Sequence, residues 1–248
     1  MAKDLFSGHA QTYNQFRPHY PHALYKYILS FVVEKDKAWD CATGNGQAAM
    51  ELVNYFNKVV ASDISKAQID QAKQHPKIEY VVGSAENTPF SSDSFDLITV
   101  AQAFHWFDHN LFAKEVQRVG KKDGVVAVWL YDRFTTNDEA FDNLMDDFYF
   151  NVTGPYWEKE RAYVDEHYNG LHFPFELLPA QNFETVNYWT KDQLIGYLTS
   201  WSAVQKYIKI HGVSPVTIIK EKIHSLWGTE SEKKIIFPIY LQLGRIKK

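Results

Sequence analysis

The sequence predicts an α/β fold in which a mostly parallel sheet carries helices on both faces. Short apolar segments with the composition of strands alternate five times with helical patterns over residues 37–131. The chain has 248 residues and contains no repeat, low-complexity tract or polar linker that would divide it. A chain of this length can bury roughly 70–75% of its unfolded surface, so its core needs no disulfide to be stable. The lone cysteine, Cys41, cannot form an internal disulfide. We therefore expect a single domain over residues 1–248.

Five strands and four helices are predicted in the first half of the chain. The apolar segments that predict strands lie at 37–41, 58–62, 78–82, 95–101 and 124–131. Helices are predicted at 21–33 after a first-turn Pro21, from Ala48 to Phe56, from Ser65 with Gln68 in capping-box position, and at 110–119 before Gly120. Because helices connect most successive strands, we expect the strands to run parallel.

The pattern changes after the fifth strand. About 50 residues separate it from the next segment with strand composition, and a structureless loop of that length is improbable in a compact domain. One helical pattern places Phe141, Leu144 and Phe148 on a face, and an aromatic stretch follows. The sequence therefore predicts that residues 132–182 form an inserted helical cap.

Two further strands and several helices are predicted at the C-terminal end. A strand at 183–188 precedes the capping-box pair Thr190 and Gln193, which opens a helical region, and a helix follows at 214–227. The last strand, 235–243, contains Pro238, which predicts an edge position or a bulge because proline cannot donate to the ladder. The count is then seven strands.

Charge and composition limit the classes of partner that the sequence predicts. The formal net charge is −4, from 26 Lys and Arg against 30 Asp and Glu, and the short lysine pairs are scattered, so no nucleic-acid partner is expected. No Cys/His cluster has zinc-ligand spacing, so no metal is expected. The first residues lack an apolar signal core and no run approaches a membrane span, which predicts a cytoplasmic protein without membrane contact. The aromatic fraction of 16% indicates either an aromatic-rich core or rings that line a pocket.

A glycine-rich turn follows the first predicted strand. Residues 44–49, Gly-Asn-Gly-Gln-Ala-Ala, satisfy the dinucleotide fingerprint G-x-G-x-x-A, in which glycines bring backbone amides close to a ligand. Asp63 ends the second strand 19 residues after Gly44, where a carboxylate can accept the hydroxyl protons of an adenosine ribose. The alternative for Asp63 is an acid that complements a helix dipole. Turn and acid together predict a nucleoside-cofactor site.

Asp40, just before the turn, bears on which cofactor is bound. A carboxylate at this point would repel a pyrophosphate but would suit a sulfonium or ammonium group. The alternative for Asp40 is a carboxylate that caps the turn.

Residues 40–46 resemble the first motif, D-x-G-x-G-x-G, of the class I S-adenosylmethionine-dependent methyltransferases. Ala42 replaces the first glycine, which indicates a negative φ or less crowding at that position. The resemblance implies a seven-stranded Rossmann-like sheet with an antiparallel last strand, and S-adenosylmethionine as cofactor with S-adenosylhomocysteine as product. It also implies that the loop 83–86 contacts adenine, through Ser84 and the next backbone amide at Ala85.

Three other segments resemble a type 11-like branch of that family, the branch that contains trans-aconitate methyltransferase. They are the His-Trp-Phe segment 105–107, the N-terminal stretch 6–21 and the segment 197–203. In that branch the N-terminal segment, here 1–33, folds over the cofactor. This implies that Tyr13 and Arg17 lie near the methionine end and that Arg17 pairs with the cofactor carboxylate. The alternative for Arg17 is a surface arginine before a proline.

Two sets of candidate site residues follow from these patterns. The cofactor-binding candidates are Tyr13, Arg17, Asp40, Ala42, Gly44, Gly46, Asp63, Ile64, Ser84, Ala85, Glu86, Ala101 and Gln102. The candidates on the substrate side follow the fourth and fifth strands or lie in the segment 197–203, because ligands of open α/β sheets bind beyond the carboxyl ends of strands. They are His105, Trp106, Tyr131, Arg133 and Trp201.

Several roles on the substrate side stay open from the sequence. His105 is either a general base near neutral pH, a donor that orients the acceptor, or a structural residue. Trp106, Trp201 and the pair Tyr156 and Trp157 are either pocket walls or core. Arg133 and Arg161 either hold an acidic acceptor or are solvated.

The sequence thus predicts an S-adenosylmethionine-dependent methyltransferase whose partner is a small-molecule acceptor, a carboxylic acid being one candidate. Three alternatives remain: a tRNA or protein methyltransferase, which the acidic balance disfavours, a nicotinamide-dependent oxidoreductase supported by the G-x-G-x-x-A match alone, and a non-catalytic cofactor-binding protein. The sequence names neither the acceptor nor the oligomeric state.

Overall fold

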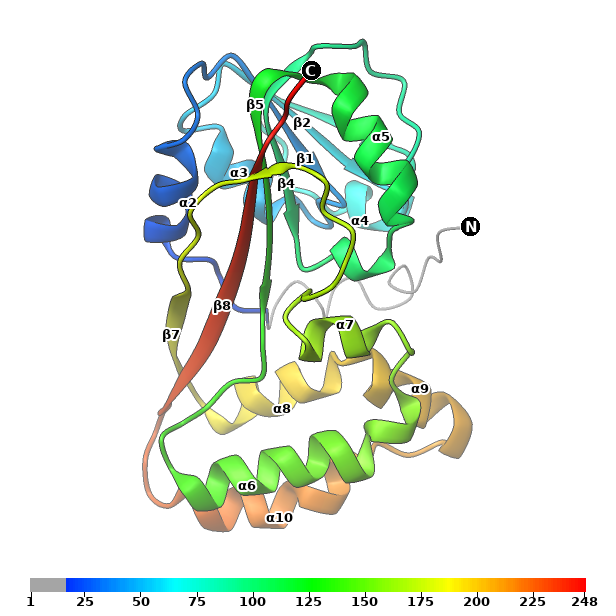
Figure 1. Cartoon of the computed structure of the whole chain (residues 1–248). Coiled ribbons are helices and arrows are strands. Elements are labelled where there is room, and N and C mark those ends of the chain that lie inside the picture. The colour runs from blue at the N-terminus through cyan, green and yellow to red at the C-terminus, as the bar shows by residue number, and fades with distance from the viewer. Residues whose placement is uncertain (1–16) are drawn as a thin grey trace.

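The structure, a computed structural model, describes residues 17–248. Figure 1 shows two parts, an α/β body above and a helical body below, which the long strands β5 (Gly120–Tyr131) and β8 (Lys233–Arg245) connect. Tyr13 and the first 16 residues of the predicted N-terminal segment lie outside the described residues.

Within residues 17–248 the sheet has eight strands in the order β3-β2-β1-β4-β5-β8, and β6 and β7 both pair with the far edge of β8. All pairings from β3 to β5 are parallel, whereas β8 runs antiparallel to its three neighbours. The predicted mostly parallel sheet with an antiparallel last strand is therefore confirmed. The additional strand is β6, which has two residues, too few to leave a pattern in the sequence. The remaining strands are β1 (Lys37–Cys41), β2 (Lys58–Asp63), β3 (Ile78–Val82), β4 (Phe95–Ala101), β6 (Glu176–Leu177) and β7 (Phe183–Trp189).

Helices cover both faces of the sheet because the central strands are apolar on both sides. Ala38 of β1 belongs to a core that includes α2 (His22–Leu29) and α3 (Gln47–Leu52). Its neighbour Trp39 points to the opposite face and belongs to a second core with α5 (His109–Val119). A short helix, α4 (Lys66–Asp70), follows β2.

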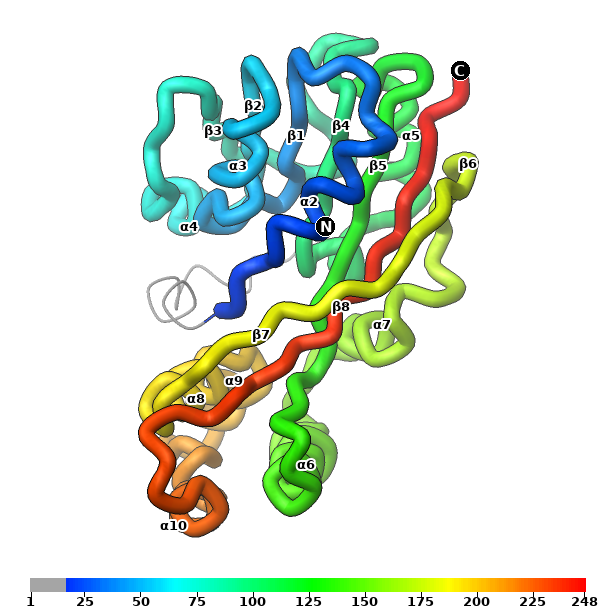
Figure 2. Tube along the Cα trace, turned by 90° about the vertical axis from the view of Figure 1, so that its left-hand side faces the viewer, coloured from blue at the N-terminus to red at the C-terminus, as the bar shows by residue number. Residues whose placement is uncertain are grey.

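The helical body is assembled from two stretches of the chain. The first supplies α6 (Glu139–Asp147), a π-helical turn (Phe148–Val152), a 3-10 turn (Gly154–Tyr156) and α7 (Arg161–Asp165). The second supplies α8 (Lys191–Thr199), α9 (Ser202–His211) and α10 (Val216–Trp227), with the predicted capping box present at α8. Figures 1 and 2 show α10 beside α6 and α8 beneath the sheet. Helices of the second stretch therefore pack with the helices of the predicted cap segment.

Pro238 lies in β8 with strands on both sides, so the predicted edge position is wrong and the alternative, a bulge, is right. Pro238 pairs with Glu184 of β7, and its carbonyl accepts from the backbone N–H of Asp132 beyond β5. The register then shifts by one residue, because three residues lie between Tyr131 and Thr135 while two lie between Ile236 and Ile239. The backbone nitrogen of Pro238, which has no hydrogen to donate, thus lies on the side of the irregular stretch between Tyr131 and Thr135.

In the part of the chain that the structure describes, no helix has the length and apolarity needed to cross a membrane.

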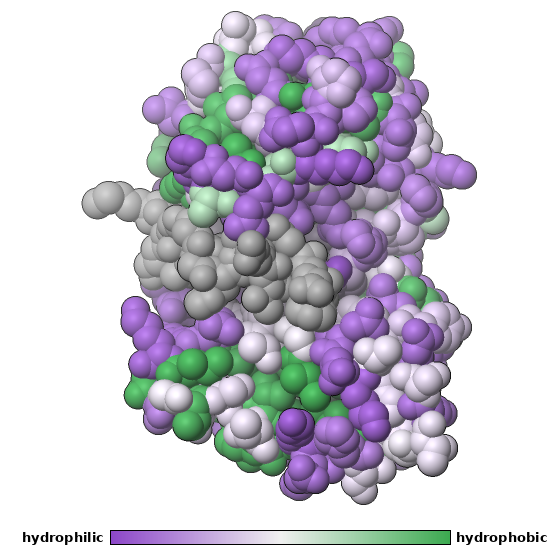
Figure 3. Space-filling model, turned by 180° about the vertical axis from the view of Figure 1, so that it is seen from behind, coloured by the Kyte–Doolittle hydropathy of each residue, from purple (hydrophilic) through white to green (hydrophobic). Residues whose placement is uncertain are grey.

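Figure 3 shows hydrophobic side chains on the helical body seen from behind. The exposed apolar residues of α9, α10 and the turn between them are Ile210, Val213 and Ile218.

Candidate active site

Three adjoining pockets lie beyond the carboxyl ends of β1, β2, β4 and β5. We name them the loop pocket, the glycine pocket and the aromatic pocket. Among the predicted site residues, the loop pocket is lined by Ala42, Gly44, Asp63, Ile64, Ser84, Ala85, Glu86, Ala101, Gln102 and Trp106. The glycine pocket is lined by Arg17, Ala42, Gly44, Gly46, Ala101, Gln102 and Tyr131. The aromatic pocket is lined by Arg17, Gln102, His105, Trp106, Tyr131, Arg133 and Trp201.

Gln102 lines all three pockets, directly after β4. Its φ is +54°, a left-handed conformation that costs a residue with a side chain of order 1–3 kcal/mol. Its backbone N–H donates to the carbonyl of Trp129, and its side-chain amide binds the backbone of Tyr131. The neighbouring strand β5 therefore holds Gln102 in this conformation where the pockets meet.

The glycine turn between β1 and α3 has the conformation that the motif requires. Gly44 and Gly46 have φ of +58° and +85°, and a Cβ added at Gly46 would lie 2.5 Å from the hydroxyl of Tyr80. At Gly44 a Cβ would meet open space, which is the space of the two pockets that it lines. Ala42 also has a positive φ, +54°, so the expected negative φ is wrong and this position keeps the glycine-like conformation.

Asp63 joins the glycine turn to the end of β2. One carboxylate oxygen accepts from the backbone N–H of Gly44 at 2.8 Å and the other from that of Ser65 at 2.8 Å. Each oxygen of a carboxylate can accept a second hydrogen bond, and Asp63 lines the loop pocket. Asp63 therefore lies at the pocket in which the sequence predicts a contact with ribose hydroxyls.

Asp40 differs from its predicted role. It is 1% exposed and lines none of the three pockets. Its carboxylate accepts from the hydroxyls of Thr43 and Thr99 and from the backbone N–H of Ala49 at 3.0 Å. Burial raises its pKa to about 6, an effect that these hydrogen bonds oppose. The structure therefore favours the alternative, a carboxylate that caps the turn, over a direct contact with a sulfonium.

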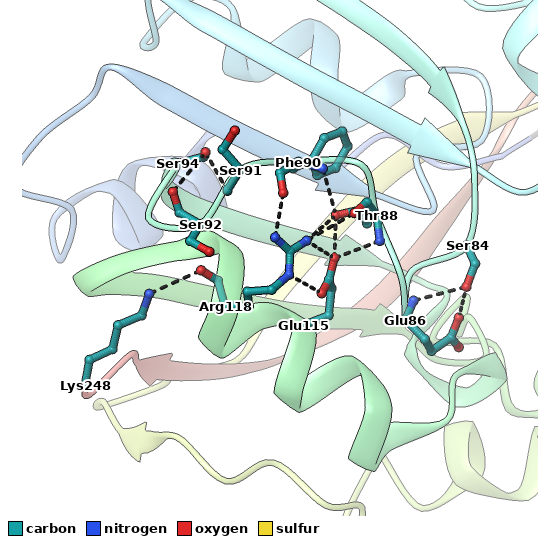
Figure 4. A network of polar contacts seen from close by, with 10 residues as sticks. All are labelled: Ser84, Glu86, Thr88, Phe90, Ser91, Ser92, Ser94, Glu115, Arg118 and Lys248. Atoms are coloured by element: carbon teal, nitrogen blue, oxygen red, sulfur yellow. Dashed lines mark hydrogen bonds and ion pairs between the residues drawn. The ribbon is translucent and has the colours of Figure 1, made fainter.

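The loop after β3 is fixed to α5 at two points. Figure 4 shows Glu115 and Arg118 of α5 beside this loop: Glu115 accepts from the backbone N–H of Thr88 at 2.7 Å, and Arg118 donates to the carbonyl of Phe90 at 2.6 Å. Nearer the loop pocket, Ser84 donates to Glu86. The other carboxylate oxygen of Glu86 accepts from the backbone N–H of Asp108, the N-cap of α5, at 3.1 Å. The predicted adenine loop is thus held rigidly at the pocket wall.

Eight of the 17 residues that line the aromatic pocket carry rings. Trp157 packs against Tyr149 and Trp201, with ring centroids 5.2 and 5.6 Å apart, and Trp201 also contacts Tyr197. Tyr156 is not among the lining residues and packs instead on Tyr207 and His211 at the surface. Of the four aromatic residues with open roles, Trp106, Trp157 and Trp201 line the pocket and Tyr156 does not.

His105 lines the aromatic pocket but is not suited to act as a base near neutral pH. It is 6% exposed, and its Nδ1 lies 2.9 Å from the hydroxyl of Tyr168. Burial, with a smaller contribution from the charge of Arg161, lowers its pKa to about 3. Its conjugate acid is too strong for a general base at pH 7, so of the roles left open, a neutral hydrogen-bonding group fits best.

Three arginines line the aromatic pocket, and they differ in their partners. Arg17 binds the hydroxyl of Tyr131 and lies over the ring of Tyr197, and Arg133 is paired with Asp146. Arg161 donates through Nε to the hydroxyl of Tyr149 at 2.7 Å, which itself donates to Asp165. Tyr149 and Asp165 therefore hold the Nε edge of Arg161, while its terminal amino groups have no hydrogen-bond partner among the described residues.

The comparisons with known proteins agree on the family. A model described as a methyltransferase domain matches residues 39–128. A protein of Dictyostelium discoideum whose name describes it as a methyltransferase is 33% identical over 98% of this chain and 95% of its own length. A solved structure from Anaeromyxobacter dehalogenans, described as a type II methyltransferase, is 36% identical with a TM-score of 0.86, over 94% of this chain and 99% of that one. This chain belongs to the class I S-adenosylmethionine-dependent methyltransferases.

A more distant likeness adds the fold alone. A structure from Methanococcus maripaludis, described as an S-adenosylmethionine-dependent methyltransferase, is 20% identical with a TM-score of 0.51, over 72% of this chain and 90% of that one. The nicotinamide-dependent alternative rested on one short motif and has no support in these likenesses. The resemblance to the trans-aconitate methyltransferase branch stays a prediction.

The residues of this methyltransferase fit its cofactor, S-adenosylmethionine. Because Gly44 has no side chain, the backbone of the glycine turn borders the pockets directly. A side chain at this position would fill part of their space. Gln68 lines the loop pocket, is 3% exposed, and its side-chain carbonyl has no hydrogen-bond partner among the described residues. An adenine amino group is a donor that such an acceptor can bind. Bound there, the cofactor would supply an activated methyl group on sulfur.

Sequence reasoning missed three residues of the methyltransferase that either line a pocket or hold a residue that lines one. Tyr149 lines the aromatic pocket and holds Arg161, Tyr168 holds His105, and Gln68 lines the loop pocket. Gln68 could have been found because it lies three residues after the cap Ser65 in the helix that follows Asp63. Tyr149 and Tyr168 carry no local signal, because their partners are distant in sequence.

Proposed function

We propose that this methyltransferase transfers the methyl group of S-adenosylmethionine to a small carboxylic acid bound in the aromatic pocket. The observation that carries the proposal is that Gln102 and Trp106 line both the loop pocket and the aromatic pocket. A cofactor with its nucleoside in the loop pocket can then present its methyl group toward an acceptor in the aromatic pocket. The arginines that line the aromatic pocket favour an acceptor with a carboxylate group.

The proposed cofactor contacts follow the lining of the two other pockets. Asp63 binds the ribose hydroxyls, Ser84 and the amide of Ala85 bind adenine, and Arg17 pairs with the carboxylate of the methionine end. Support for the last contact is that Arg17 lines both the glycine and the aromatic pocket. On this view the segment 1–33, of which Arg17 is part, covers the cofactor.

The cap role of residues 132–182 is part of the same proposal. This segment supplies Arg133, Tyr149, Trp157 and Arg161 to the aromatic pocket. The aromatic lining excludes water around the acceptor, and a small molecule suits a pocket walled by packed rings better than a polymer does. Trp201 from the second helical stretch lines the pocket beside them.

The chemistry required of the protein is alignment rather than proton transfer. The sulfonium is already activated, so the rate depends chiefly on in-line placement of the acceptor and exclusion of water. A carboxylate acceptor needs no base, which agrees with a neutral His105.

The test is to incubate the protein with methyl-labelled S-adenosylmethionine and a metabolite pool, and to identify labelled products by mass spectrometry. We expect a small labelled ester that mild alkali hydrolyses to labelled methanol. Label found solely in alkali-stable products, in RNA or in protein would contradict the proposal. A salt-dependence measurement of RNA binding separates the nucleic-acid alternative.

A further inference from the structure

We propose that Arg161, Trp157 and His105 form a carboxylate subsite inside the aromatic pocket, which takes an acid whose carboxylate is carried on a flat, apolar body. The inference rests on the proposed function and deepens it, because it names the groups that hold the acceptor. Each of the three side chains lines the pocket.

Arg161 supplies the charge of the subsite. Its Nε is occupied by the hydroxyl of Tyr149 at 2.7 Å and lies 3.6 Å from Asp165, so one edge of the guanidinium is fixed by the protein. The terminal amino groups, which could bind both oxygens of a carboxylate side by side, have no hydrogen-bond partner among the described residues. Tyr149 and Asp165 thus orient the guanidinium and leave its planar end for a ligand.

Trp157 supplies a second donor. Its indole N–H is buried and has no acceptor among residues 17–248. A buried donor without a partner is costly, and a ligand oxygen would remove that cost. The guanidinium carbon of Arg161 lies 5.0 Å from the centre of the Trp157 ring, so the two donors are neighbours.

His105 supplies a third donor when its tautomer is fixed by Tyr168. The hydroxyl of Tyr168 lies 2.9 Å from Nδ1, and Tyr168 is 1% exposed. In our assignment the hydroxyl donates to Nδ1, which leaves the proton of the neutral ring on Nε2. The turn that carries Tyr168 has φ of +54° and +62° at residues 167 and 168, a conformation that costs free energy and that these contacts hold in place.

The acidic side chains of the pocket do not compete for this subsite. Asp132 lies 2.8 Å from His167, and Asp146 is paired with Arg133. The remaining carboxylate, Glu158, lies 2.9 Å from Lys206. Because each acid has a basic partner of its own, the free end of Arg161 gives the subsite its preference for an anion. The surrounding rings favour a flat body on that anion.

The test uses benzoate as the probe, with benzamide and acetate as matched controls for charge and ring. The full chain, saturated with S-adenosylhomocysteine and labelled with nitrogen-15 at tryptophan, gives indole N–H signals, and Trp157→Phe identifies the signal of Trp157. We expect benzoate to shift that signal saturably and to bind at least about tenfold more tightly than benzamide or acetate. Equal binding of benzoate and benzamide would overturn the carboxylate subsite, and equal binding of benzoate and acetate would overturn the flat body.

Arg161→Met tests the residue directly. We expect at least about a tenfold loss of benzoate affinity, with S-adenosylhomocysteine affinity by calorimetry unchanged within about twofold. Arg245→Met, the same substitution outside the pockets, should change neither affinity. Full benzoate affinity in Arg161→Met would overturn the subsite while leaving the cofactor site intact. Absence of S-adenosylhomocysteine binding in the unaltered protein would instead contradict the cofactor site on which both proposals rest.

Discussion

The side-chain amide of Gln102 and the backbone of Tyr131 are joined by two hydrogen bonds. The amide oxygen accepts from the Tyr131 N–H at 2.8 Å, and the amide nitrogen donates to the Tyr131 carbonyl at 3.2 Å. The pair connects the ends of β4 and β5 at the place where the three pockets meet. These two hydrogen bonds therefore hold the ends of β4 and β5 together at the junction of the loop pocket and the aromatic pocket.

Gln102→Ala should lower the free energy of unfolding by about 1–3 kcal/mol, because two backbone groups of Tyr131 lose their partners. Denaturant titration measures the change. Gln74→Ala, which alters an exposed glutamine with a local contact, serves as the control and should have little effect. Equal stability of the two variants would show that the double hydrogen bond is not needed.

Asp40 should make the protein lose stability as the pH rises from about 4 to about 6. Its folded pKa of about 6 exceeds the ordinary carboxyl value of 3.8, so in this range the unfolded chain ionises while the folded protein keeps the proton. The shift corresponds to about 3 kcal/mol. Measured against Asp40→Asn, which cannot titrate, the unfolding free energy should fall by about that amount between pH 4 and pH 7. A difference that does not vary with pH would contradict the buried, protonatable carboxylate.

His105 should remain neutral from pH 8 down to about pH 4. Because burial lowers its pKa to about 3, below its ordinary value of 6.5, the neutral ring contributes stability above about pH 6.5 that is lost as the pH falls. Nitrogen-15 shifts of the ring, assigned with His105→Gln, should show one neutral tautomer from pH 8 down to about pH 4. A titration midpoint between 6 and 7 would restore the interpretation of His105 as a general base.

Ala42→Gly should raise the free energy of unfolding by up to about 1 kcal/mol. The alanine is held at φ +54°, where a Cβ is disfavoured, and glycine adopts that conformation without the penalty. The gain is limited because glycine also makes the unfolded chain more flexible. Ala48→Gly, inside α3, should have the opposite sign. Destabilisation by Ala42→Gly as large as that by Ala48→Gly would mean that the positive φ is not a source of strain.

Local patterns in the sequence account for β1 to β5 and for the glycine turn with Asp63. Period and turn chemistry act over a few residues, so they can be recognised without the fold. The role of Asp40 stayed open between a cofactor contact and a turn cap, because its partner Thr99 lies 59 residues away. The partner of His105, Tyr168, is likewise 63 residues away and could not be recognised from the sequence. The segments 132–182 and 190–228 each show helices, but only packing reveals that α6, α8 and α10 form one body.

The most direct test of the cofactor site is the binding of S-adenosylhomocysteine to the Asp63→Ala variant, measured by calorimetry. The loss of two hydrogen bonds to a charged acceptor predicts a fall in affinity of at least about tenfold relative to the unaltered protein. Asp70→Ala, an exposed acid on α4 paired with Lys66, is the matched control and should bind normally. Unchanged affinity in Asp63→Ala, in protein whose circular dichroism shows an intact fold, would contradict the site.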